Sequence, residues 1–318
     1  MLVFQIMKLH KGIFEILLLS MLWGPSFLFI KIAVGDIAPL TMTALRTLIG
    51  VSLLYIVLKF RKICLWKYRK LWIHCFIIGI FANGIPWLCF NFAVQTISTS
   101  LSALINGTTP VLTIILANIF LKDEQLTWSR GIGATVGLVG FGVLFLPAVF
   151  GSLQGGELGL DIRGILLSLM GASCYAVGII YVRKNLPSIP PLVAPVMQLF
   201  SSLLYLIPAA FIFESPLPMI QTASLSSWLG VLGLAVFGTA FAFIMYYRII
   251  ERQGATAVST VTYLLPIFGA TLGVGFLKET LDVQFFIAAI LIFSGVLIVN
   301  SVIPLPFLNR GKIAHLAR

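Results

Sequence analysis

Arg46 is the only charged side chain well inside an apolar stretch of this sequence. Charged side chains in such positions are costly, and they mark either solute sites or structural contacts. Arg46 could anchor a carboxylate or phosphate of a solute. Alternatively, it could clamp the structure by snorkelling outward or by donating to backbone carbonyls at a helix break. We favour the clamp because long cations snorkel readily.

Asn83, Trp87 and Asn91 follow one another at intervals of four residues in another apolar stretch. In a helix this spacing places them on one face, and the neighbouring Pro86 could break the helix and free backbone groups. The three side chains offer hydrogen bonds and an aromatic surface to a solute. Packing between helices is an equally favoured alternative, because Asn commonly bonds across helices in membranes.

Polar residues precede a proline in two further stretches: Asn106 precedes Pro110, and Tyr263 precedes Pro266. A proline removes a backbone donor and leaves a carbonyl free one turn earlier. Nearby hydroxyls and amides could simply satisfy those carbonyls. In the alternative interpretation the two prolines are hinges of a moving structure, and Asn106 and Tyr263 face a solute.

The remaining candidates for a solute cavity are aromatic or hydroxyl-bearing residues in three more apolar stretches. They are Trp23, Ser26, Tyr175, Thr239, Phe243 and Tyr246. Any one of them, taken singly, is better explained by packing than by ligand binding. Together with the residues above they make up the predicted cavity.

No carboxylate accompanies these residues in the middle of an apolar stretch. Of the ten acidic residues, Glu15 lies near one end of such a stretch, and the other nine lie in or beside the connecting segments. Proton relays and tight cation sites in membranes usually need a buried carboxylate. The sequence therefore favours facilitated diffusion or exchange over obligate proton coupling.

Sequence signatures of catalysis and metal binding are missing. No HExxH, Gly-x-Ser-x-Gly or Walker pattern is present, and the three histidines are too scattered for a metal cluster. The four cysteines follow no metal or redox spacing. We therefore expect no catalytic residues, no metal and no cofactor.

The elements that must position these side chains are membrane helices. Of the 318 residues, 59% are hydrophobic and only 10% are charged, and the mean hydropathy is +1.07. Soluble proteins average about 45–50% apolar and about 25% charged residues. The apolar residues form stretches of the length that a helix needs to cross a bilayer. The chain is therefore predicted to be an all-α polytopic membrane protein.

Ten such stretches are predicted to be transmembrane helices. They run over Gly12–Val34, Pro39–Phe60, Leu71–Val94, Thr99–Leu121, Thr127–Val149, Arg163–Val182, Pro191–Phe213, Leu225–Ile249, Ala255–Leu277 and Val283–Ile303. Of the 21 Lys and Arg residues, 17 then lie on the side of the N-terminus, three lie on the opposite side and Arg46 lies within a span. The positive-inside rule makes both termini cytoplasmic. The net charge of +11 therefore reflects topology and lipid headgroups, not nucleic acid.

The two halves of the chain contain similar segments. Thr99–Lys122 aligns with Ala255–Lys278 without gaps, and Pro110 and Pro266 coincide in the alignment. Each half holds five spans, an odd number, so the second copy would cross the membrane in the opposite sense. We predict a 5+5 inverted repeat with a solute site between the copies. The predicted parts are residues 12–149 for the first copy, 150–162 for a linker, 163–303 for the second copy and 304–318 for a cytoplasmic tail.

Motifs in several spans resemble those of the EamA-type family of the drug/metabolite transporter superfamily. Leu22–Phe27 with Lys31 is similar to the family's opening "LWGsnf…K", and Leu45-Arg46 after Pro39 is similar to its "P…LR". The two segments that lead from proline to Phe-Leu-Lys and a Glu-x-Leu are similar to its "P…FLgE.l". Gly171–Tyr175 departs from the pattern, because a Trp is expected there.

The resemblance implies ten helices in a 5+5 inverted repeat, cytoplasmic termini and a central cavity lined mainly by helices 1, 3, 4, 6, 8 and 9. It also implies export or exchange of amino acids, other metabolites or toxic organic compounds. We therefore expect transport of a small amphipathic metabolite, such as an amino acid, across a bacterial inner membrane. An organic-cation, choline-like or drug carrier with an aromatic cavity is the alternative, and a membrane enzyme or channel is the alternative of another class. The expected partners are the solute and the lipid bilayer, and the sequence leaves the oligomeric state open.

Overall fold

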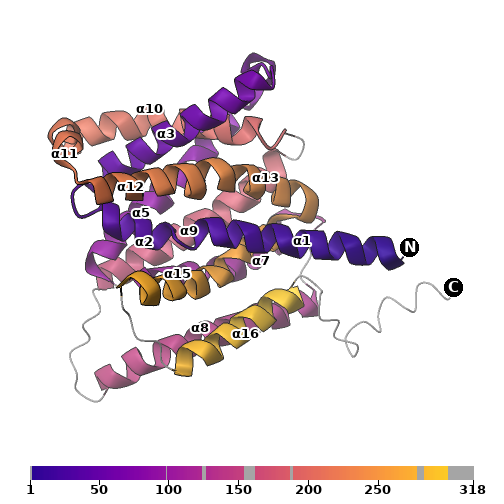
Figure 1. Ribbon diagram of the computed structural model, residues 1–318. Helices are drawn as coiled ribbons and strands as arrows, with labels where there is room; N and C mark the ends of the chain where they lie inside the picture. The colour runs from indigo at the N-terminus through magenta and orange to yellow at the C-terminus, as the bar shows by residue number, and fades with distance from the viewer. Residues whose placement is uncertain are drawn as a thin grey trace.

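The computed structural model describes residues 2–97, 99–123, 127–153, 162–186, 189–277 and 283–299. Within those residues all regular secondary structure is helical (Figure 1). Most of the predicted linker, Lys278 and the predicted cytoplasmic tail at 304–318 lie outside the described residues.

The first half of the chain forms long helices that are interrupted at several points. In order they are α1 (Leu2–Trp23), α2 (Ser26–Ala33), α3 (Pro39–Phe60), the 3-10 helix η1 (Leu65–Leu71), α4 (Trp72–Ile78), the π-helical η2 (Gly79–Gly84), α5 (Ile85–Thr96), α6 (Thr99–Asn106), α7 (Thr109–Phe120) and α8 (Trp128–Leu153).

The second half is built in a similar way. Its elements are α9 (Ile162–Asn185), α10 (Val193–Phe213), α11 (Pro216–Thr222), α12 (Leu225–Ala235), the π-helical η3 (Val236–Phe241), α13 (Ala242–Gln253), α14 (Ala255–Ser259), α15 (Val261–Leu277) and α16 (Val283–Val299). The two π-helical turns occur in the third predicted span of one half and in the third predicted span of the other.

Six helical segments among the described residues are long and apolar enough to cross a membrane. They are Gly12–Ala33, Pro39–Phe60, Leu65–Thr96, Arg163–Asn185, Val193–Phe213 and Leu225–Gln253. Thr109–Phe120, Ala255–Phe268 and Phe286–Val299 are shorter apolar helices. The chain is thus a polytopic helical membrane protein, while the count of ten spans and the orientation of the termini stay predictions.

The first predicted span is not one continuous helix, because the chain breaks at Gly24 and Pro25. Pro25 cannot donate a backbone hydrogen bond, so a helix ends readily before it. A side chain at Gly24 has no room: a Cβ atom there would lie 2.3 Å from the Cβ atom of Phe268. The break therefore lets α1 and α2 approach α15 closely.

The two prolines that coincide in the sequence alignment do not occupy equivalent places in their helices, and their role as hinges stays a prediction. Pro110 stands in the first turn of α7, directly after a break at Gly107–Thr108. A proline fits there because the first amides of a helix have no partner within it. Pro266 lies inside α15, and the break in that span comes earlier, at Thr260. The break at Thr260 has no proline next to it, so the alignment could not locate it.

Helices α8 and α16 pack against each other along one side of the bundle (Figure 1). Glycines make this contact close: a Cβ atom on Gly133 would lie 2.8 Å from the carbonyl oxygen of Gly295. One on Gly295 would lie 2.7 Å from the carbonyl oxygen of Gly133. Small residues allow such approach between membrane helices. The large buried core lies mainly among the remaining helices, with Ala288 and Ile292 contributed by α16, and it also holds the cavity described next.

Candidate functional site

An internal cavity lies in the middle of the bundle, and residues from both halves of the chain line it. Its volume is about 70 Å³, several times the roughly 10–15 Å³ that one water molecule needs. The lining consists of Trp23, Ser26, Phe27, Ile30, Arg46, Ala82, Trp87, Phe90, Asn106, Thr109, Tyr175, Ile179, Gln198, Phe243, Tyr246, Val258, Thr262 and Leu265. Neither α8 nor α16 contributes to it.

Most of the residues predicted for a solute cavity meet in this lining. They are Trp23, Ser26, Trp87, Asn106, Tyr175, Phe243 and Tyr246, with Arg46 among them. They come from α1, α2, α3, α5, α6, α9 and α13, so the cavity exists only when both halves are folded together.

Asn83 and Asn91, in contrast, lie outside the cavity and bond to neighbouring helices. Asn83 is fully buried, accepts a hydrogen bond from Gln198 Nε2 at 2.6 Å and donates to Ser202 Oγ at 3.4 Å. Asn91 donates to Thr43 Oγ1 at 2.8 Å. The predicted stripe rests on regular α-helical spacing from Asn83 to Asn91, but η2 changes the register before Trp87. Even in a regular helix each step of four residues turns by about 40°, which carries Asn91 toward α3.

Thr239 and Tyr263 also lie outside the lining, in supporting positions. Thr239 accepts a hydrogen bond from Arg46 Nε at 2.8 Å and donates to the carbonyl of Leu234. Tyr263 packs against α8, where a Cβ atom on Gly137 would lie 2.9 Å from its ring. The predicted solute contact of Tyr263 is therefore replaced by packing in this structure.

Arg46 makes contacts of the kind expected of a clamp and also lines the cavity, while its role as a solute anchor stays a prediction. Its Nε and Nη2 atoms donate to Thr239 Oγ1 at 2.8 Å and to the carbonyl oxygen of Gly238 at 3.0 Å, both in η3. Its Cζ atom lies 3.8 Å from the centre of the Trp87 ring, a cation–π contact. The side chain is only 5% exposed and lines the cavity. Arg46 is thus a clamp on a helix irregularity and also a buried positive charge in the cavity wall.

Ser26 lies next to this charge. Its Oγ atom is buried and has no hydrogen-bond partner in the described part of the chain. A Cβ atom on Gly238 would lie 3.1 Å from Ser26 Oγ and 3.5 Å from Arg46 Nη2, so both groups flank the same glycine. Trp23 reaches the same place, because its Nε1 donates to the Gly238 carbonyl at 3.0 Å.

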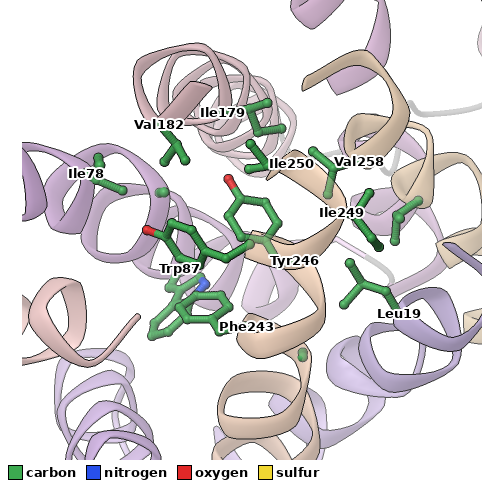
Figure 2. Close-up of a cluster of buried hydrophobic side chains, with 14 of the residues drawn as sticks. Leu19, Ile78, Trp87, Ile179, Val182, Phe243, Tyr246, Ile249, Ile250 and Val258 are labelled. Carbon is green, nitrogen blue, oxygen red and sulfur yellow. The ribbon is translucent and has the colours of Figure 1, made fainter. Parts of the chain in front are cut away.

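Aromatic rings form much of the remaining wall. Figure 2 shows Trp87, Phe243 and Tyr246 gathered beside Ile179, Ile250 and Val258. The ring centres of Trp87 and Phe243 are 5.9 Å apart, as are those of Phe243 and Tyr246. Phe90 and Tyr175 stack at 5.8 Å. Such rings offer an apolar surface to a flat or branched side chain.

Two lining residues with amide side chains differ in how many of their hydrogen-bonding groups protein contacts already occupy. Gln198 donates to Asn83 Oδ1 and accepts from the Tyr247 hydroxyl, so protein groups already hold both of its ends. The Asn106 oxygen accepts from Thr109 Oγ1 at 3.2 Å. Gln198 was missed at the sequence level, although a glutamine inside the seventh predicted span was a usable signal.

No carboxylate lines the cavity among the residues that the structure describes. Glu15 is buried, only 4% exposed, but it lies elsewhere and pairs with Arg248 at 3.0 Å and Arg252 at 3.4 Å. These contacts tie α1 to the end of α13. The sequence had placed Glu15 correctly near one end of a span, but the two arginine partners become visible only in the fold.

Outside the apolar segments, Asp36 connects the end of α2 to the start of α12. Its carboxylate accepts hydrogen bonds from the Ser224 hydroxyl and amide and from the Ser227 hydroxyl. These bonds hold the pKa of Asp36 below its usual value. The first predicted span is therefore joined to the eighth at both ends, and Trp23 joins them in the middle.

The sequence model of a family described as the EamA-like transporter family matches residues 10–146 and 162–301. The chain belongs to the EamA-like transporter family. This confirms the resemblance seen in the motifs.

Relatives of similar length are known in bacteria. The chain is 27% identical over 301 residues to the uncharacterized inner membrane transporter YedA of Escherichia coli K12, covering 92% of this chain and 91% of the relative. It is 23% identical over 288 residues to the uncharacterized transporter YvbV of Bacillus subtilis, with 89% of each chain covered. One solved crystal structure matches with a TM-score of 0.72 at 20% identity, covering 95% of this chain and 99% of the other. That likeness concerns the fold alone.

Proposed function

We propose that this protein moves a small amphipathic metabolite of the amino-acid class across a bacterial inner membrane, by export or exchange. Its central cavity would open alternately to the two sides. The observation that carries the proposal is the cavity itself, in which one guanidinium and several aromatic rings meet, with no carboxylate among the described residues that line it. Membership of a transporter family and the apolar helices support the membrane and the transport.

An inverted 5+5 repeat with ten spans and cytoplasmic termini would supply the moving halves. The family match in two separate segments supports two copies. The π-helical turns η2 and η3 support it too, because each falls in the third predicted span of its half. Two halves of similar build can exchange inward-open and outward-open shapes around one site.

The charge in the cavity favours a solute with a carboxylate over an organic cation. A cation would need an aromatic face, and the guanidinium of Arg46 already covers that of Trp87. Two like charges about 5 Å apart repel by roughly 3 kcal/mol at an effective dielectric constant of 20. A polyphosphate would need several cations, and among the described lining residues Arg46 is the only Lys or Arg.

The same lining bears on energy coupling. Because none of the described lining residues is a carboxylate, and because Glu15 is paired with two arginines, we infer facilitated transport or exchange without obligate proton coupling. A proton-coupled carrier would normally need an acid that can be protonated in contact with the solute path.

Counterflow into proteoliposomes tests the proposal. Liposomes preloaded with each of a panel of amino acids, choline-like amines or sugars receive the same radiolabelled compound outside, with and without a pH gradient. We expect accumulation of at least one apolar or aromatic amino acid and none of choline. Transport restricted to amines, or ion conductance without solute, would overturn the proposal, and strict dependence on a pH gradient would overturn the inference about coupling.

A matched pair of tryptophan variants ties the result to the cavity. Trp87→Ala removes a lining ring that contacts Arg46 and should reduce counterflow at least tenfold, because burying a large apolar side chain is worth about 1.5–3 kcal/mol. Trp128→Ala removes a ring that is 73% exposed at the start of α8 and should leave counterflow unchanged. Equal effects of the two variants would argue against the cavity as the solute path.

A further inference from the structure

We propose that Arg46 and Ser26, which both lie beside Gly238, form a carboxylate-binding subsite in the cavity wall. The aromatic rings of the lining would hold the apolar part of the same ligand. The inference rests on the proposed function, since it names the group by which the carried solute is recognised. It assigns a ligand class to two particular side chains and can fail independently of transport.

The guanidinium has donors left over for a ligand. Of the five N–H groups of an arginine, the structure uses one on Nε and one on Nη2 for contacts to η3. The part of the chain that the structure describes provides no hydrogen-bond partner for Nη1. A planar carboxylate matches two parallel N–H groups of a guanidinium better than other anions of a single charge.

The buried charge of Arg46 is costly without a partner of opposite charge. Only 5% of Arg46 is exposed, and no described carboxylate forms an ion pair with it. Buried cations in membrane proteins are usually paired, and here a bound carboxylate would supply the missing negative charge. The contact with Trp87 offsets only part of the cost.

The Ser26 hydroxyl supports the same location independently. It is a buried polar group without a partner, which is costly and uncommon in folded proteins. It lies on the Gly238 side of the cavity, where Arg46 Nη2 also lies. A carboxylate there would accept from the hydroxyl and from the guanidinium together, which satisfies both groups.

The rest of the cavity lining suits an apolar group. Phe90 stacks on Tyr175, and Phe243 packs on Tyr246, while Ile179 and Val258 complete this part of the lining. A ligand with a carboxylate at one end and a ring or branched chain at the other would therefore bind in one orientation.

A matched pair of probes isolates the carboxylate. The purified full-length protein in detergent is titrated with 3-phenylpropionate and with its neutral amide, 3-phenylpropionamide, and the dissociation constants are obtained from thermal stabilisation. The wild-type protein should bind the carboxylate at least tenfold more tightly than the amide. No binding of the carboxylate, or equal binding of the two, overturns the subsite.

Variants then assign the preference to residues. Arg46→Gln should weaken carboxylate binding by about 10- to 100-fold, the range for a hydrogen bond to a charged group, and leave amide binding nearly unchanged. Arg46→Lys keeps the charge but loses the planar pair of donors, so we expect an intermediate value. Ser26→Ala should weaken carboxylate binding about threefold.

Ser201→Ala is the matched control. Ser201 is also buried, but its hydroxyl donates to the carbonyl of Met197 in its own helix and it does not line the cavity. The carboxylate preference of the Ser201→Ala variant should equal that of the wild type.

If Arg46→Gln does not fold, Ser26→Ala and Arg46→Lys test the subsite instead. An unchanged carboxylate preference in both variants overturns the subsite.

The counterflow assay separates this inference from the proposed function. Transport of amino acids without a carboxylate preference in the binding assay would remove the subsite and keep the carrier. A carboxylate preference lost in Arg46→Gln, in a protein that transports none of the panel, would keep the subsite and remove the amino-acid carrier.

Discussion

The two π-helical turns are built alike, but their chemistry differs. Each is clamped by a long helix from the other half of the chain: α10 clamps η2, and α3 clamps η3. At η2 the clamp consists of neutral groups, in which Asn83 bonds with Gln198 and Ser202, and Tyr205 donates to the Gly79 carbonyl at 2.6 Å. At η3 a single charged side chain, Arg46, bonds both Thr239 and Gly238.

This difference indicates which of the two turns can bind a ligand and which one only maintains the structure. The amide of Asn83 is consumed by protein contacts, and so is that of Gln198, so η2 has little to offer a ligand. Beside η3 the guanidinium keeps unused donors and the Ser26 hydroxyl has no partner. π-helical turns are frequent at functional sites, but here only one of the two combines the turn with spare hydrogen-bonding groups. A backbone repeated in two halves thus carries a single, asymmetric site.

Thr239→Asp should give the largest effect, because it introduces a carboxylate at the position that already contacts Arg46 Nε. The new acid would neutralise the guanidinium from within the protein, and an intramolecular partner outcompetes a dissolved one. We expect carboxylate binding and counterflow of the transported amino acid to fall about 100-fold or more while the protein stays folded. Thr239→Ser keeps the hydroxyl and should transport normally. Wild-type transport by Thr239→Asp would show that the charge of Arg46 beside η3 has only a structural role.

Asn83→Asp makes the corresponding change at η2, and its effect should be on stability. No described cation bonds Asn83, and the side chain is fully buried, so an ionised acid there would be unpaired. We expect a loss of about 2–4 kcal/mol in the free energy of unfolding, read as a lower melting temperature in detergent. Transport per folded molecule should persist. A selective loss of transport at unchanged stability would mean that η2 also contacts the solute.

Replacing one glycine by alanine in each turn, Gly79 in η2 and Gly238 in η3, tests the contrast between the two turns. A Cβ atom on Gly79 would lie 2.8 Å from Ser202 Oγ and 3.1 Å from the Gln198 carbonyl, inside a filled contact. Gly79→Ala should therefore cost about 1–3 kcal/mol of stability. Gly238→Ala would put a methyl group between Ser26 and Arg46, so its main effect should be carboxylate binding weakened about tenfold.

Gly131→Ala is the control for both glycine variants, because nothing lies within 4 Å of a Cβ atom there. Its melting temperature and its carboxylate affinity should stay within error of the wild type or rise slightly, since alanine favours helix more than glycine. A drop in melting temperature for Gly238→Ala as large as that for Gly79→Ala would remove the distinction between the two turns.

The sequence predicted the charged and aromatic residues of the site better than the way the backbone presents them. Arg46 and Trp87 stood out because such side chains are unusual in apolar stretches. The π-helical turns left no comparable signal: neither η2 nor η3 contains a proline, and a change of helical register depends on contacts with α10 and α3. For that reason the sequence leaves solute contact and helix packing equally open for Asn83, and it does not identify Thr239 as the partner of Arg46.

Tyr205→Phe should give the smallest effect of the set. It removes one neutral hydrogen bond, from the Tyr205 hydroxyl to the Gly79 carbonyl, which is worth about 1 kcal/mol. Ser202 also approaches this carbonyl, with Oγ at 3.4 Å, and would keep it from being left without a partner. We therefore expect a small fall in melting temperature with unchanged counterflow and an unchanged carboxylate preference. A large loss of transport would mean that the neutral clamp on η2 takes part in the movement of the two halves. The two turns would then differ in their chemistry and not in whether they serve transport.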